Sequence, residues 1–484
     1  MKQVITGING LDKVLEGGFL RPSIVLIAGT AGTGKTTLAM QSLFNSAKNE
    51  EICMYITALS EPIAMINNFM SKFSFYNISL LGKGNVKYVP IGIDIIHDGS
   101  EAIIKEIEKN IETIKPDRIV IDPVNVFVYG LDGESQRKFY YDFFTSMKGW
   151  NSLVLLTGEF TQDSLIKNTL GYMVDGIIYI SNEPFYENNI RYLNVLKMRG
   201  HEFQGGKHSC KINKDGFNVY PIIRAKTRTS VSNERISTGV KGIDKMTKGG
   251  FIRGSSILIS GSSGTGKTIL GTQFIMDGLL RNEPGIIVSF EEDVEQIRAN
   301  SNTLKWNLQE FENKNLLKII SPLEYDAYEL ALHIEETADA MKTKRLLMDG
   351  TGRLQRILPQ YAQLPEYMGT ISNILKSKNI TAIYTNETSN LTGATQITGM
   401  GISPFLDTVI LLRYVEIKSE MRKAISVLKM KGSDHDKEIR EIIISNNGAE
   451  IKLPFGEYSG LLSGNPINTL SQAFVEAFKK KSYD

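Results

Sequence analysis

Short runs of branched apolar residues recur along the chain, and amphipathic segments of helical length separate them. These runs are residues 23–28, 118–122, 153–157, 176–180, 256–260, 285–289, 345–349, 381–385 and 408–412. Nearly continuous apolar runs of this length are typical of strands buried on both faces of a parallel sheet, and the longer segments suit crossover helices. The pattern therefore predicts an α/β fold with mainly parallel central sheets flanked by helices.

The whole pattern occurs twice at a constant interval. Residues 6–19 return 232 residues later as residues 238–251, and Lys429 follows Lys197 by the same interval. An internal repeat overrides an estimate of domain number from chain length. The stretch between the copies is polar and charged without periodicity, as in a linker. We predict a first domain, a linker, a second domain and a tail at residues 1–223, 224–236, 237–465 and 466–484.

Composition narrows the class of protein. The chain has 55 basic and 53 acidic residues, a balance that argues against a nucleic-acid-binding protein. Its two cysteines, Cys53 and Cys210, lie in unlike contexts, which argues against a disulfide framework or a metal site and fits a reducing compartment. The sequence has no signal peptide and no apolar run of about 20 residues. We expect a cytoplasmic protein that contacts no membrane.

Each half carries a glycine-rich loop between a predicted strand and a predicted helix. Residues 29–36 and 261–268 both fit G-x-x-x-x-G-K-[ST] in the context that this motif requires. Backbone N–H groups of such a loop surround a polyphosphate, the lysine reaches the β- and γ-phosphates, and the hydroxyl ligates Mg²⁺. We expect ATP and Mg²⁺ as cofactors. The predicted nucleotide contacts are Gly32, Thr33, Gly34, Lys35, Thr36, Thr37, Gly264, Thr265, Gly266, Lys267, Thr268 and Ile269.

An aspartate ends a later apolar run in each half, at Asp122 and Asp349. A carboxylate in that position can hold the water shell of Mg²⁺ beside the hydroxyl of the loop. We therefore expect metal sites formed by Thr36 with Asp122 and by Thr268 with Asp349. In the alternative interpretation, each aspartate only caps the turn that follows its strand.

Two adjacent carboxylates, Glu291 and Glu292, follow an apolar run of the second half. The carboxyl end of a parallel strand beside the P-loop is where ligands bind, and repulsion between the two groups raises one pKa and makes it a better base. A solvated acidic turn is the alternative. In the first half Leu59 and Ser60 stand at these positions and Glu61 follows. The two sites are therefore predicted to be unequal, with Glu61 a candidate for weak hydrolysis.

Two basic segments lie late in each half, Lys197-Met198-Arg199 and Lys429-Met430-Lys431. Alternate residues of a strand share one face. In a ring of P-loop domains, each pair of cations could reach the γ-phosphate of a neighbouring subunit, as an arginine finger does. From the residues alone, a solvated basic strand is the better interpretation.

These motifs together resemble the KaiC family of double-domain RecA-like ATPases, whose best-known members are autokinases of the cyanobacterial circadian clock. The resemblance covers nearly the whole chain and is most specific in residues 410–421, 429–437, 439–441 and 462–466. It implies two tandem RecA-like P-loop NTPase domains in each subunit. It also implies a homohexamer of two stacked rings with ATP at the subunit interfaces.

The resemblance also implies roles for individual residues. Glu291 would be the general base of the kinase site, with Glu292 as its neighbour. Contacts to the nucleotide of the adjacent subunit would come from Lys423, Lys429 and Lys431. His201 is expected to make at most a minor nucleotide contact, because Phe203 stands where the family has its histidine.

The chain departs from the family at the phosphorylation segment. Clock members phosphorylate an adjacent Ser and Thr just before an Asp-Thr pair. Here Ser403 is retained, whereas Pro404 stands at the Thr position and has no hydroxyl. We expect any autophosphorylation at Ser403, with Thr398 the lesser candidate, and a turn-capping role for Ser403 is the alternative. With the first-half glutamates also replaced, the sequence indicates a divergent, non-clock member.

Three functions stay open at this point. The leading hypothesis is a hexameric ATPase and serine/threonine autokinase whose nucleotide or phosphorylation state controls an unidentified regulatory or signalling protein. The second is a nucleotide-gated scaffold, in which the first half binds ATP for assembly and the second hydrolyses it slowly. The third is a DNA-acting motor or recombinase, since the fold is shared with RecA and replicative helicases. The balanced charge weighs against the third.

Overall fold

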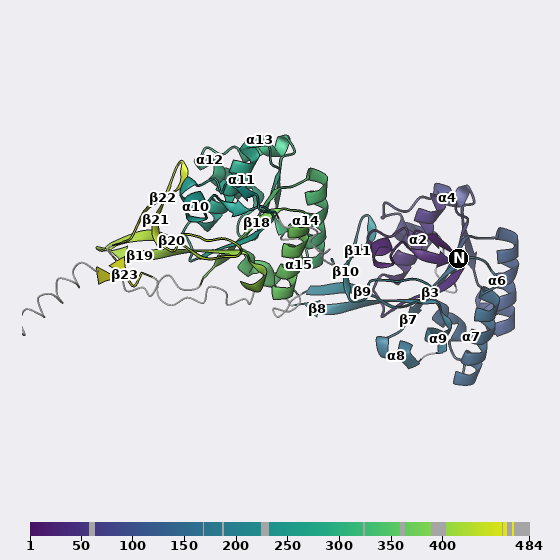
Figure 1. The fold of residues 1–484 in the computed structure, drawn as a ribbon. Helices are drawn as coiled ribbons and strands as arrows, with labels where there is room; N and C mark the ends of the chain where they lie inside the picture. The colour runs from purple at the N-terminus through teal and green to yellow at the C-terminus, as the bar shows by residue number, and fades with distance from the viewer. Residues whose placement is uncertain are drawn as a thin grey trace, which may run out of the picture. The chain divides into compact units, whose positions relative to one another are not determined.

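The computed structural model describes residues 1–57, 63–167, 169–185, 188–223, 232–322, 325–358, 364–388, 403–456, 458–461 and 467–468. The chain divides into two compact units, Met1–Ile222 and Ile223–Asp484. Each unit has its own large sheet and its own helices (Figure 1). Most of the predicted linker and tail lies outside the described residues.

The first unit alternates strands and helices, as the apolar pattern predicted. Its strands are β1 (Lys2–Val4), β2 (Phe19–Arg21), β3 (Ser23–Gly29), β4 (Cys53–Thr57), β5 (Val86–Pro90), β6 (Arg118–Asp122), β7 (Leu153–Glu159), β8 (Gly176–Phe185), β9 (Asn188–Met198), β10 (His208–Asn213) and β11 (Gly216–Tyr220). Its helices are α1 (Leu11–Val14), α2 (Lys35–Ala47), α3 (Ile63–Met70), α4 (Ser79–Gly82), α5 (Ile93–His97), α6 (Ser100–Ile114), the 3₁₀ helix η1 (Val124–Val128), α7 (Gly133–Met147), α8 (Gln162–Lys167) and α9 (Thr169–Met173).

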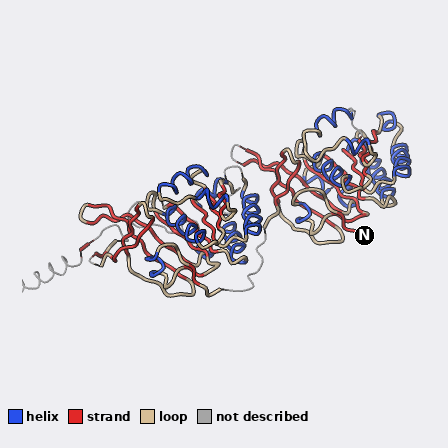
Figure 2. The backbone as a smooth tube through the Cα atoms, turned by 90° about the horizontal axis from the view of Figure 1, so that it is seen from above, coloured by secondary structure: helices blue, strands red, loops and turns tan. Residues whose placement is uncertain are grey.

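The large sheet of the first unit has the strand order β11-β10-β9-β8-β3-β7-β6-β4-β5 within the described residues. The strands from β8 to β5 pair in parallel, and β9, β10 and β11 extend the sheet with antiparallel pairs. Figure 2 shows the strands between helices in each unit. The mainly parallel sheet flanked by helices confirms the predicted fold class.

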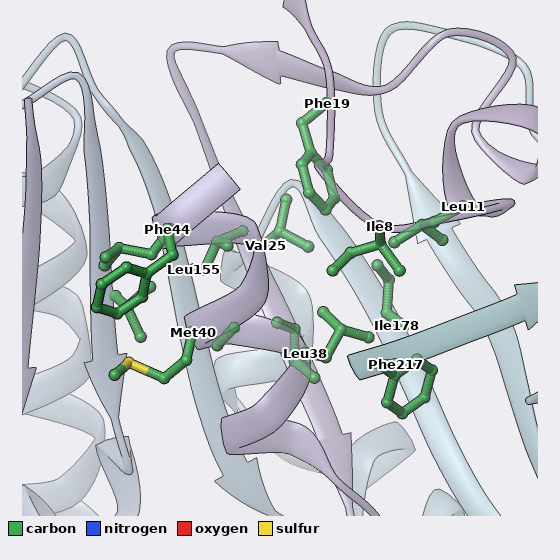
Figure 3. Packing of buried hydrophobic residues seen from close by; sticks show 14 of the residues in the cluster. Ile8, Leu11, Phe19, Val25, Leu38, Met40, Phe44, Leu155, Ile178 and Phe217 are labelled. Atoms are coloured by element: carbon green, nitrogen blue, oxygen red, sulfur yellow. The ribbon is translucent and has the colours of Figure 1, made fainter. Parts of the chain in front are cut away.

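Helix α2 packs an apolar face against this sheet (Figure 3). Leu38 and Phe44 of α2 are fully buried with Val25 of β3, Leu155 of β7 and Phe217 of β11. Full burial of one such side chain contributes about 1.5–3 kcal/mol relative to exposure. A second apolar cluster, to which α6 and α7 contribute, covers the other face of the sheet. This packing fixes α2, and with it the loop from which α2 starts.

The second unit repeats the architecture. Its strands are β12 (Arg235–Ile236), β13 (Phe251–Ile252), β14 (Ser256–Gly261), β15 (Gly285–Ser289), β16 (Leu317–Ile320), β17 (Arg345–Asp349), β18 (Thr381–Glu387), β19 (Thr408–Ile417), β20 (Glu420–Met430), β21 (Arg440–Ser445), β22 (Gly448–Pro454), β23 (Tyr458–Ser459) and β24 (Ile467–Asn468). Its helices are α10 (Lys241–Met246), α11 (Lys267–Leu280), α12 (Val294–Thr303), α13 (Leu308–Asn313), α14 (Ala327–Met341), η3 (Thr351–Arg356), α15 (Leu364–Ser377) and η5 (Ser403–Phe405).

Its large sheet has the order β16-β15-β17-β18-β14-β19-β20-β21-β22, again parallel up to β19 and antiparallel beyond it. One buried cluster contains residues of α11, and another contains residues of α14 and α15, so apolar layers lie on both faces. In neither unit does a described helix combine the length and the apolar character that crossing a membrane requires.

Candidate nucleotide-binding sites

Both glycine-rich loops connect the carboxyl end of a central strand to a long helix, β3 to α2 and β14 to α11. The residue before each helix is a glycine with positive φ, 95° at Gly34 and 104° at Gly266. Other residues rarely adopt this conformation. A Cβ atom on Gly266 would also lie 2.0 Å from Cδ1 of Ile444. Glycine is therefore required, and the free N–H groups at the start of each helix favour an anion.

A threonine and the lysine of each loop converge on one backbone carbonyl. Thr33 Oγ1 and Lys35 Nζ donate to the Thr30 carbonyl oxygen over 2.9 and 2.8 Å. Thr265 and Lys267 repeat this in the second loop over 2.8 and 2.9 Å. Burial lowers the pKa of both lysines. An ammonium whose hydrogen bond goes to a neutral carbonyl can exchange it for a charged phosphate oxygen, so both loops fit the polyphosphate of ATP.

The second unit places the predicted metal-binding pair in contact. Thr268 Oγ1 donates to both carboxylate oxygens of Asp349, over 3.2 and 3.0 Å, and Thr385 Oγ1 donates to Oδ1 over 2.6 Å. Burial raises the pKa of Asp349, and these hydroxyl hydrogen bonds oppose the rise. A hydroxyl and a carboxylate this close at the start of the P-loop helix fit Mg²⁺, an oxygen-seeking cation. The contact with Thr268 favours the metal-binding interpretation over turn capping.

Glu291 and Glu292 follow β15, which β17 and β18 separate from the P-loop strand. Burial against the cavity wall raises the pKa of Glu291, and the charge of Asp349 adds to the rise. Glu292 has other partners, because Asn300 Nδ2 donates to its Oε1 over 3.0 Å and its N–H donates to Ser289 Oγ over 3.1 Å. The neighbouring glutamates therefore differ, and Glu291 has the surroundings of a base.

A cavity of about 370 Å³ extends from the second P-loop towards α12. Its size is in the range of small-molecule sites. Both glutamates line it, together with Lys267, Thr268, Ile269 and the apolar side chains Ile297, Leu304, Trp306 and Ile444. Lys423 of β20 also lines this cavity, with Nζ 5.9 Å from the ring centroid of Tyr414. Lys423, which the resemblance assigned to a neighbouring subunit's nucleotide, thus lines the P-loop cavity of its own chain.

Sequence reasoning missed a carboxylate at each loop. Glu159 ends β7 and Glu387 ends β18, each paired in register with the first glycine of the loop. Their negative charges oppose the fall in pKa of Lys35 and Lys267, respectively. The signal was present, since both glutamates lie two residues beyond a predicted apolar run, but only the strand order brings them to the loops.

The first unit surrounds its strand-end aspartate differently. Asp122 Oδ2 accepts a hydrogen bond from Tyr55 Oη over 3.0 Å, and Oδ1 accepts one from Thr157. Asp122 also lies close enough to oppose the fall in pKa of Lys35, so its carboxylate is near the loop and fits Mg²⁺ there. Among the described residues, Thr36 donates no hydrogen bond to Asp122. Glu61 lies outside the described residues.

The basic pair of the first unit contacts its own domain. Arg199 forms a 3.4 Å ion pair with Asp175 and remains 58% exposed. Met198 packs against the core. Lys197 Nζ donates to the carbonyl oxygens of Gly171, Tyr172 and Val174 over 3.1, 3.1 and 2.6 Å. Lys197 therefore caps the end of α9 instead of extending from a solvated strand.

The basic pair of the second unit lies near the predicted phosphorylation segment. Lys431 Nζ donates to the Pro404 carbonyl oxygen over 2.9 Å. Burial lowers the pKa of Lys429, and Lys431 adds to this effect. Met430 between them is buried.

The backbone of Ser403 begins η5. The side chain of Ser403 and all of Thr398 lie outside the described residues. His201 Nδ1 is 2.8 Å from the carbonyl oxygen of Glu202, a contact within its own loop. Thr37 follows Thr36 in the first turn of α2.

A family model described as "ATPase: KaiC" matches this chain twice, over residues 4–224 and 236–454. The chain belongs to the KaiC ATPase family. It is 32% identical to the "Circadian clock oscillator protein KaiC" of Parathermosynechococcus lividus over 479 residues, which cover 95% of this chain and 87% of that protein. It is also 32% identical to the protein of the same name from Thermostichus vulcanus, over 96% of this chain and 92% of that protein.

Family membership and the two loops together make this chain an ATP-binding ATPase with tandem RecA-like P-loop domains. At about one-third identity to the clock proteins, it is a divergent member. The predicted resemblance is confirmed. The family match does not say which residues bind ATP or take part in its hydrolysis. Those roles are proposed below from the geometry of the two sites.

Proposed function

We propose that the second domain (237–465) hydrolyses ATP and that the first domain (1–223) holds ATP mainly to assemble the protein. Glu291 carries the proposal. Its carboxylate lines the cavity of the second P-loop, beside Lys267 and close enough to Asp349 for the charges to interact. At the corresponding sequence position the first domain has Leu59.

In the proposed reaction Glu291 accepts a proton from the attacking water. Its raised pKa brings it closer to the operating pH, which is where a general base is most effective. Lys267 neutralises charge on the transferred phosphoryl group, as P-loop lysines do. Mg²⁺, held by Thr268 and Asp349, supplies further positive charge to the phosphate oxygens when it is bound. Trp306 and neighbouring apolar side chains line part of the cavity wall.

For the intact protein we propose a homohexamer with ATP at the subunit interfaces, as the family resemblance implies. Arg199 and Lys431 support this, because their side chains are 58% and 47% exposed and would reach a neighbouring nucleotide by exchanging their contacts with Asp175 and Asp407. Lys197, held by three carbonyls, fixes the strand end from which Arg199 extends. We propose that the ring works in the cytoplasm as a nucleotide-controlled switch for a regulatory or signalling protein.

Autophosphorylation at Ser403 is the second candidate function, and one observation favours it. The backbone after Ser403 is anchored, since Lys431 binds the Pro404 carbonyl over 2.9 Å and Lys376 binds the Phe405 carbonyl over 3.1 Å. A fixed backbone is what an acceptor hydroxyl needs for in-line transfer. Since Pro404 removes the second acceptor of the clock proteins, we propose a switch outside the clock.

Steady-state ATP hydrolysis by Glu291→Gln tests the proposal. Removal of a general base typically lowers the rate 10²- to 10⁴-fold, so turnover should fall strongly while ATP binding persists. Glu295→Gln is the matched control, because Glu295 is 82% exposed one turn further on and pairs with Arg298. Glu292→Gln should have the smaller effect of the two cavity variants. A fall of less than about threefold for Glu291→Gln would place the chemistry elsewhere, with Glu61 the next candidate.

A further inference from the structure

The two strand-end aspartates differ in one hydrogen-bond donor. Thr157 in the first domain and Thr385 in the second donate to Asp122 and Asp349 from corresponding strands, β7 and β18. The other oxygen of Asp349 is bonded by Thr268, the expected metal ligand itself. The other oxygen of Asp122 is instead bonded by Tyr55.

Tyr55 is well placed to hold that carboxylate permanently. It lies in the middle of β4, it is 3% exposed, and its ring packs against Tyr88 at 5.3 Å between centroids. Burial and this packing hold the ring beside Asp122. At the corresponding position of β15 the second domain has Ile287, whose side chain has no hydroxyl to donate.

The difference matters when a cation binds. In the second domain the hydroxyl of Thr268, the expected metal ligand, also orients Asp349 by donating to it. In the first domain, Asp122 is already oriented by two residues that are not metal ligands, Tyr55 and Thr157. Carboxylate oxygens have lone pairs enough to accept these bonds and still receive metal-bound water. Outer residues that orient metal ligands in this way typically contribute 10- to 100-fold to metal affinity.

We propose that Tyr55 is a positioning residue that raises the affinity of the first domain for Mg²⁺ and so helps this domain to retain ATP. The inference rests on the proposed function, because it takes Asp122 as part of the first Mg²⁺ site. A firmly held metal keeps ATP bound in a domain whose proposed task is assembly. Tyr55 acts on the proposed metal site through its hydrogen bond to Asp122.

Tyr55→Phe tests the proposal, since it removes one hydroxyl and keeps the ring. The matched control is Tyr88→Phe, because the hydroxyl of Tyr88 is buried and has no hydrogen-bond partner among the described residues. Both variants are made in full-length protein carrying Lys267→Ala, which confines tight nucleotide binding to the first domain. Retention of a fluorescent ATP analogue is measured as Mg²⁺ is titrated, and again in EDTA.

Tyr55→Phe should raise the Mg²⁺ concentration for half-maximal retention by about 10- to 100-fold relative to Tyr88→Phe, with equal retention in EDTA. Thr157→Val, which removes the other hydroxyl, should shift the Mg²⁺ midpoint in the same direction. This variant tests the proposal if Tyr55→Phe does not fold. Equal Mg²⁺ midpoints for Tyr55→Phe and Tyr88→Phe overturn the inference alone. Retention that never depends on Mg²⁺ in the Lys267→Ala parent overturns the proposed first metal site as well.

Discussion

Gly350 leaves the space that Glu291 occupies. A Cβ atom on Gly350 would lie 2.5 Å from Cγ and 3.1 Å from Cδ of Glu291. Gly350 directly follows Asp349 and has φ of 79°, a conformation that also disfavours a side chain. The residue after the proposed metal-binding aspartate thus determines where the proposed base can lie.

Gly350→Ala should therefore impair catalysis more than folding. We expect a large fall in turnover because Glu291 is displaced, and a loss of about 1–2 kcal/mol of stability from the left-handed backbone. Gly352→Ala is the control, since its Cβ would meet only Asn386 Oδ1, at 3.2 Å. Turnover and thermal unfolding of both variants check this, and normal turnover in Gly350→Ala would separate Glu291 from the chemistry.

The pH dependence of ATP hydrolysis should report the ionisation of Glu291. The base must be ionised to accept a proton, and its pKa is raised, so kcat should fall on acidification at a pH above the ordinary glutamate value of about 4.3. The charge of Glu387 contributes to that rise. Glu387→Gln should therefore move the acid limb to lower pH, and Glu295→Gln should leave it in place. A limb that stays fixed in Glu387→Gln would mean that another group is titrating.

The sequence predicted what depends on local pattern. The apolar runs located the parallel strands, and the two G-x-x-x-x-G-K-T loops were placed correctly between strand and helix. The sequence also placed Asp349 beside Thr268, and the two side chains are hydrogen-bonded, because a strand-end carboxylate and a P-loop hydroxyl meet at one edge of a parallel sheet. Their role as metal ligands stays a prediction.

What depends on strand order and on side-chain direction was not predictable. Glu387 reaches the loop only because β18 is inserted next to β14. The hydrogen bond between Tyr55 and Asp122 joins two strands. The pattern of apolar residues predicts strands but does not predict which hydroxyl groups on them form hydrogen bonds. The sequence favoured a solvated side chain for Lys197. In the structure its ammonium binds carbonyl groups at the end of α9, a contact that depends on how α9 packs.

Assembly should depend on the first P-loop more than on the second. Lys35→Ala removes the ammonium that would hold phosphate in the first domain, so light scattering with ATP should show smaller particles. Lys267→Ala, its exact counterpart in the second domain, should still assemble. Full hexamers in Lys35→Ala with no nucleotide in the first domain would refute the assembly role.

Labelling with γ-phosphate tests the second candidate function. If the protein is an autokinase, wild-type protein should incorporate label and Ser403→Ala should lose most of it, with Thr398→Ala losing the smaller share. Label that persists unchanged in Ser403→Ala would remove Ser403 as the acceptor. No label in wild-type protein would leave the chain an ATPase switch without kinase activity.

The inequality of the two sites is tested most directly by a single turnover. Protein loaded with ATP at both sites is supplied with Mg²⁺, freed of unbound nucleotide and sampled over time, and the bound nucleotides are extracted. Wild-type protein should convert one of its two nucleotides to ADP quickly and keep the other as ATP, and Glu291→Gln should keep both as ATP. Rapid conversion of both nucleotides in the wild type, or of either one in Glu291→Gln, would contradict the division between a holding and a hydrolysing domain.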